Sequence, residues 1–71
     1  MLSTIALDER WLRIVRAEFL EMPGLRLTLA QACRLWGLPP DTTRALLAEL
    51  VAEGLLRRTA DGTFCRADLA P

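Results

Sequence analysis

Helix stops and turn signals follow one another closely in the stretch Leu27–Arg66, and their spacing constrains the fold more than any other feature of the chain. Gly37 and Gly54 are two such stops, because glycine readily takes the left-handed conformation that ends helices. Asp61-Gly62 is typical of the turn of a β-hairpin. The stretch therefore has room for two short helices joined by a tight turn, followed by a hairpin.

The first of these helices is expected over residues 29–36. Thr28 and Gln31 have the spacing of a capping box, in which each side chain satisfies a backbone donor at the start of the helix. The apolar residues recur at the spacing of one helix face. They form the expected buried side: Leu29, Ala32, Cys33 and Trp36.

The second helix is expected over residues 40–53. Pro40 suits the first helical position, and Asp41 complements the helix dipole in the first turn. The expected buried side consists of Thr43, Leu47, Leu50 and Val51, with Leu46 beside it. The expected outer side carries Thr42, Arg44, Ala45, Ala48, Glu49 and Ala52.

The hairpin is expected over residues 55–67, and two registers fit its sequence. A two-residue Asp-Gly turn would set Arg57 across from Arg66, whereas a three-residue loop with Gly62 in a bulge would set Leu56 there. A pair of like charges on facing strands is unfavourable unless an anion lies nearby. The turn residues alone leave both registers open.

An additional helix is expected before this stretch, over residues 7–22. Leu12, Val15 and Phe19 have helical spacing, and Pro23-Gly24 ends the pattern. The short segment 25–27 that follows is a connector, or a brief strand that could pair with the hairpin. The chain, 1–71, is thus expected to form a single domain, mostly α with a small β-hairpin.

Hydrophobic residues make up 52% of the 71-residue chain, which is more than a small monomer easily hides. The predicted first helix offers a second apolar stripe beside its core face. We therefore expect a homodimer whose contact includes the following residues: Ile5, Leu7, Trp11 and Ile14.

Several function classes find no support in the composition. The chain has no His and only two cysteines, Cys33 and Cys65, so one chain cannot form a zinc site of three or four Cys and His ligands, and no cofactor is indicated. His and Tyr are absent and Ser3 is the single serine, which argues against an enzyme. A membrane span and a signal peptide are also absent from the sequence, and we expect a cytoplasmic protein.

The segment Thr28–Arg66 resembles the winged helix-turn-helix domains of bacterial transcription regulators. In that family a Thr or Ser cap, a Gly-Leu turn, a helix opening on proline, a second Gly-Leu and a DG-tipped hairpin occur together. They correspond here to Thr28, Gly37-Leu38, Pro40–Leu50, Gly54-Leu55 and Asp61-Gly62. The resemblance implies a three-helix winged helix-turn-helix, with residues 7–22 as the remaining helix.

The resemblance also implies a DNA-binding surface. Thr42 and Arg44, near the start of the helix at 40–53, would reach base edges or phosphates in the major groove. The phosphate contacts would come from the hairpin and from the outer side of the helix at 29–36: Arg57, Arg58, Arg66 and Arg34, with Arg26 beside them. The implied function is binding of duplex DNA in transcription regulation.

Two features favour a protein partner instead. Nine arginines balance nine acidic residues, so phosphate affinity must come from local clustering. The outer side of the predicted DNA-reading helix carries three alanines and Glu49, where family members that bind DNA usually carry basic or amide side chains. A winged-helix adaptor that docks on another protein is therefore the alternative function.

Overall fold

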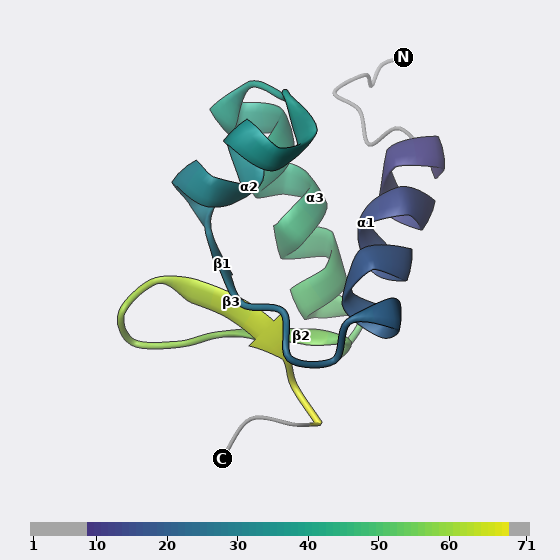
Figure 1. Ribbon diagram of the computed structural model, residues 1–71, viewed down its shortest axis with the longest axis vertical. Helices are drawn as coiled ribbons and strands as arrows, with labels where there is room; N and C mark the ends of the chain where they lie inside the picture. The colour runs from purple at the N-terminus through teal and green to yellow at the C-terminus, as the bar shows by residue number, and fades with distance from the viewer. Residues whose placement is uncertain (1–8, 69–71) are drawn as a thin grey trace.

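The computed structural model describes residues 9–68, which form three helices and a three-stranded antiparallel sheet (Figure 1). The helices are α1 (Glu9–Glu21), α2 (Leu29–Trp36) and α3 (Pro40–Ala52). The strands are β1 (Leu27–Thr28), β2 (Leu56–Arg58) and β3 (Thr63–Arg66). This order confirms the winged helix-turn-helix fold. The predicted start of the first helix, at residue 7, lies outside the described residues.

The turn between α2 and α3 is built from the predicted local signals. Thr28 Oγ1 accepts a hydrogen bond from the Gln31 backbone N–H at 3.2 Å, and Gln31 Oε1 accepts one from the Thr28 N–H at 2.9 Å. Gly37 ends α2 with a φ of 65°, a left-handed conformation that glycine adopts without strain. Pro40 then opens α3, so the chain changes direction within a few residues.

The buried side of α3 differs from the prediction at two positions. Leu46, expected beside the buried face, is fully buried, whereas Val51, expected within it, is 37% exposed. The reason is that α3 is covered by α1 and α2 as well as by β2. The buried stripe is therefore centred on Thr43, Leu46, Leu47 and Leu50, and residue 51 falls at its outer edge.

Thr43 is the one polar residue among the described buried residues. Its hydroxyl donates to the carbonyl oxygen of Pro39 at 2.9 Å, and its backbone N–H donates to the same oxygen at 3.0 Å. Because a buried hydroxyl costs stability only when it lacks a partner, threonine is tolerated here.

The sheet has the order β1-β3-β2, and its register settles the alternative left open by the sequence. Leu56 faces Arg66, so residues 60–62 form a three-residue loop and no arginine lies across from Arg66. Gly62 has a φ of 85°, and its N–H donates to the Thr59 carbonyl at 2.9 Å. The segment before α2 contributes the brief strand β1, in which Leu27 pairs with Phe64.

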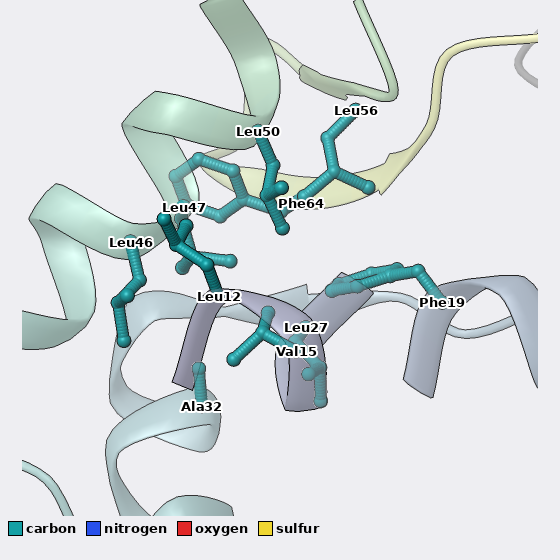
Figure 2. Close-up of a cluster of buried hydrophobic side chains, with 10 residues drawn as sticks. All are labelled: Leu12, Val15, Phe19, Leu27, Ala32, Leu46, Leu47, Leu50, Leu56 and Phe64. Atoms are coloured by element: carbon teal, nitrogen blue, oxygen red, sulfur yellow. The ribbon is translucent and has the colours of Figure 1, made fainter. Parts of the chain in front are cut away.

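All three helices and the sheet contribute to one hydrophobic core (Figure 2). Its buried members are Leu12, Val15, Phe19, Leu27, Ala32, Leu46, Leu47, Leu50, Leu56 and Phe64. The predicted buried side of α2 is only partly correct, because Ala32 alone is buried there while Leu29, Cys33 and Trp36 are half-buried. The core fixes the orientation of α3 and so determines which of its residues face outward.

Candidate nucleic-acid interface

The outward side of α3 carries a stripe formed by Arg44, Ala48 and Val51, which are spaced to lie along one helix face. Arg44 Nη1 donates to Asp41 Oδ1 at 3.0 Å. The two side chains are 60% and 97% exposed, so this ion pair is well solvated and adds little stability. The Arg44 guanidinium can therefore exchange Asp41 for another acceptor at small cost.

The hairpin presents Arg57 and Arg58 on β2, an edge strand of the sheet. Successive side chains of a strand point to opposite faces, so the two guanidinium groups leave the sheet on different sides. Arg58 lies against the hairpin tip, where its Nη2 is 4.0 Å from the position that a Cβ of Gly62 would occupy. Both arginines are exposed.

A groove of about 410 Å³ separates the α3 stripe from the hairpin. Three elements or segments line it. The lining residues are Arg44, Ala48 and Val51 of α3, Arg58, Gly62 and Phe64 of the hairpin, and Leu29 of α2. Two arginines from different elements, Arg44 of α3 and Arg58 of β2, therefore line one largely apolar groove.

The hairpin tip also carries a carboxylate. Asp61 Oδ1 accepts hydrogen bonds from the Thr59 hydroxyl and from the Thr63 N–H, the latter at 3.3 Å. These bonds, the Thr59 bond above all, lower the pKa of Asp61 below its ordinary value of 3.8. Asp61 is thus ionised at neutral pH, and its negative charge lies on the same hairpin as Arg58.

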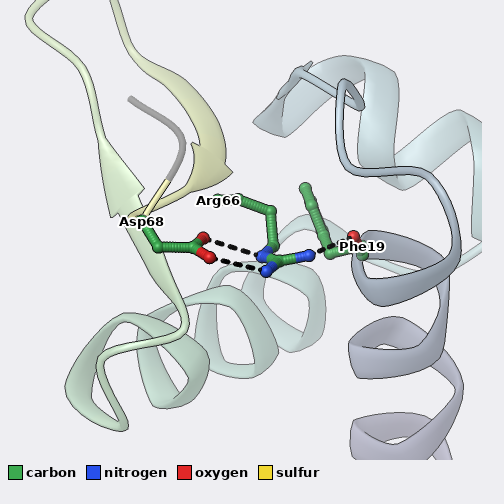
Figure 3. Close-up of polar contacts among 3 residues, drawn as sticks. All are labelled: Phe19, Arg66 and Asp68. Carbon is green, nitrogen blue, oxygen red and sulfur yellow. Dashed lines mark hydrogen bonds and ion pairs between the residues drawn. The ribbon is translucent and has the colours of Figure 1, made fainter. Parts of the chain in front are cut away.

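Arg66 makes intramolecular contacts (Figure 3). Its Nε and Nη2 donate to the two carboxylate oxygens of Asp68 at 3.0 and 2.8 Å, and its Nη1 donates to the Phe19 carbonyl at 3.4 Å. The side chain is only 16% exposed. The contact ties the end of β3 to the last turn of α1, and Arg66 does not line the groove.

The remaining residues predicted to bind DNA lie outside the groove lining. Thr42 is half-buried on α3, Arg34 is exposed in the last turn of α2, and Arg26 is exposed just before β1. The structure therefore brings together only Arg44 and Arg58 of the predicted set on one groove. Sequence reasoning missed Val51 and Phe64 as groove residues, because both belong to patterns that predict burial.

The predicted dimer stripe is only partly within the described residues. Ile14 is 44% exposed on α1. Trp11 is half-buried and packs against the core of its own chain. Ile5 and Leu7 lie outside the described residues.

Residues 9–68 contain no candidate for a metal site or a membrane-spanning helix. Within that range no three His, Cys, Asp or Glu side chains gather where they could hold a metal ion. No helix there has the length and apolar character needed to cross a membrane. Cys33 and Cys65 are both free thiols.

Comparison with known protein families identifies a match for most of the chain. The family model of the IclR helix-turn-helix domain matches residues 9–60, which contain all three helices, β1 and β2. No curated protein and no solved structure shows a significant similarity to the chain.

The Arg66 contact predicts a pH effect that can be measured. The Arg66 hydrogen bonds hold the pKa of Asp68 below its ordinary value of 3.8. A carboxyl group whose pKa is lower in the folded chain stabilises the fold above its unfolded pKa, and this contribution is lost as the pH falls through the folded pKa. Arg66→Gln should therefore raise the pKa of Asp68 towards 3.8, and the stability difference from wild type should shrink as the solution is acidified below about pH 4.

Carboxyl-carbon NMR titration measures this pKa directly. Asp61 is the internal control, because its low pKa depends on Thr59 and Thr63 and should not change in the variant. An Asp68 pKa that is identical in wild type and Arg66→Gln would contradict the assigned contact.

Proposed function

Since this chain belongs to the IclR helix-turn-helix domain family, a family of bacterial DNA-binding transcription regulators, we propose that it binds duplex DNA and regulates transcription by occupying its site. In this proposal α3 lies in the major groove and the β2–β3 hairpin follows the neighbouring backbone. The protein then acts in the cytoplasm, by binding alone, with neither a cofactor nor a catalytic step.

The observation that carries the proposal is the position of Arg44 and Arg58 on opposite walls of one groove. Arg44 lies in the first half of α3, the part of a recognition helix that reaches base edges, and its fork of donors suits the O6 and N7 acceptors of guanine. Arg58 would neutralise a phosphate beside the groove. Thr42 and Arg57 would add contacts on either side.

Arg34 and Arg26 are secondary phosphate contacts in this proposal, because they are exposed but do not line the groove. We assign Arg66 to the support of the hairpin, since its guanidinium is mostly buried and already binds Asp68 and the Phe19 carbonyl. The DNA contact thus rests on few arginines.

The modest charge sets the expected strength of binding. Asp41 and Asp61 lie close to Arg44 and Arg58 in sequence, and the chain as a whole is neutral. If two or three phosphates are neutralised, affinity should fall about 10- to 40-fold between 50 and 200 mM salt. Specificity must then come from base contacts rather than from a large electrostatic attraction.

The direct test compares two variants that lose the same charge. Arg58→Ala removes a groove arginine, and Arg13→Ala removes an exposed arginine of α1. In fluorescence anisotropy titrations of labelled duplex, Arg58→Ala should weaken binding and reduce the slope of log K against log salt by about 0.9. Arg13→Ala should change neither the affinity nor the salt slope. Absence of salt-dependent binding by wild type, or equal losses in both variants, would sink the proposal.

A second candidate function is a protein-docking module. The exposed side of α3 supports it, because Ala48 and Ala52 are exposed and Val51 is partly so, which suits packing better than hydrogen bonding to bases. A docking module without DNA binding would show no salt-dependent binding to duplex DNA. The duplex titration therefore separates the two candidates.

We also propose that the chain forms a homodimer through α1. Ile14 supports this proposal, since an exposed isoleucine on that helix would be covered by a second copy. Ile5, Leu7 and the exposed edge of Trp11 would extend the same contact. A two-fold dimer would present two α3 helices to a pseudo-palindromic site.

Light scattering at micromolar concentration tests the dimer. Wild type should be dimeric, and Ile14→Glu should be monomeric because a charge would be buried at the contact. Leu35→Glu is the matched control, because Leu35 is also a large exposed apolar residue but lies on α2. That variant should stay dimeric. A monomeric wild type, or a dimeric and folded Ile14→Glu variant, would refute the contact.

A further inference from the structure

The groove between α3 and the hairpin has an unusual composition for a surface that reads DNA. Between Arg44 and Arg58, its lining is supplied by apolar side chains, among them Ala48, Val51 and Phe64. None of these three side chains can donate or accept a hydrogen bond. A base edge that presented only polar groups to them would lose water and gain no partner.

The major groove of DNA offers one apolar group, the C5 methyl of thymine, and alanine or another apolar side chain is its usual contact. Ala48 and Val51 follow Arg44 along the same face of α3 at intervals of four and three residues. A base pair close to the one that Arg44 contacts would therefore meet an apolar surface.

We propose, as a consequence that rests on the proposed DNA-binding function, that the Ala48–Val51 surface reads the C5 methyl group of a pyrimidine. Recognition then combines one guanidinium, from Arg44, with apolar contact to a thymine one or two base pairs away. 5-Methylcytosine carries the same methyl group and should satisfy the same surface.

This assignment accounts for the low charge of α3. The helix needs few donors if part of its discrimination comes from excluding water around a methyl group. The ion pair of Arg44 with Asp41 is solvated, and it leaves the other donors of the guanidinium available for an acceptor on the base. Arg58, which lines the same groove from the hairpin, would contact the neighbouring phosphate backbone.

The experiment begins with selection of bound duplexes from a random library by the whole protein. In the selected duplex each thymine is then replaced singly by deoxyuridine, which lacks the methyl but keeps every hydrogen-bonding group. At one or two positions this replacement should weaken binding about fourfold, the effect of exposing one methyl group. At a position where the selected base can be cytosine, 5-methylcytosine should strengthen binding by a similar factor.

Two variants test whether Val51 is responsible for the difference in affinity between thymine and uracil. Val51→Thr preserves the shape of the side chain and introduces a hydroxyl, and it should reduce the thymine-to-uracil difference to less than twofold. Leu20→Thr makes a polar change at an exposed position of α1 and should leave the difference intact.

The outcomes separate this inference from the function on which it rests. Salt-dependent duplex binding with no sensitivity to uracil at any position overturns methyl recognition and leaves DNA binding in place. Duplex binding without any base preference in the selection likewise overturns methyl recognition and leaves DNA binding in place. Absence of duplex binding overturns both.

Discussion

The burial of one side of α3 is the interaction on which the rest of this structure depends. Leu46, Leu47 and Leu50 are fully buried, and they lie where α1, α2 and β2 all contact the helix. Thr43 joins them because the Pro39 carbonyl accepts its hydroxyl. With three elements covering it, α3 has no freedom to rotate about its axis, so the identity of its outward residues follows from the core.

That outward side explains both the support for DNA binding and its modest expected strength. Arg44 is held at the groove by the same helix that buries the leucines, and Arg58 reaches the groove from a hairpin whose register the core residue Leu56 helps to fix. Between them the lining is apolar. In the proposed function, binding would therefore rely on shape, on a few guanidinium groups and on contact with apolar parts of DNA rather than on a basic surface.

Features that depend on neighbouring residues could be predicted from the sequence, whereas features that depend on tertiary contacts could not. The capping box at Thr28 and the stop at Gly37 involve neighbouring residues, so the sequence alone identified them. The hairpin register stayed open because both loops suit Asp61-Gly62. In the structure Leu56 lies across from Arg66, a pairing that avoids placing two arginines opposite each other. The exposure of Val51 depends on how two other helices cover α3. Arg66 also binds the Phe19 carbonyl, which lies 47 residues away in the sequence, and an arginine on a strand carries no local sign of such a distant partner.

The most direct measurement of the central claim, that α3 and the hairpin form the DNA-binding surface, is a two-dimensional NMR titration of the labelled protein with a selected duplex. The largest changes in amide chemical shift should occur at Arg44, Ala48, Arg58 and Gly62, which line one groove. The amide of Arg13, on α1, should change little. Changes confined to α1, or no changes at low salt, would contradict the claim.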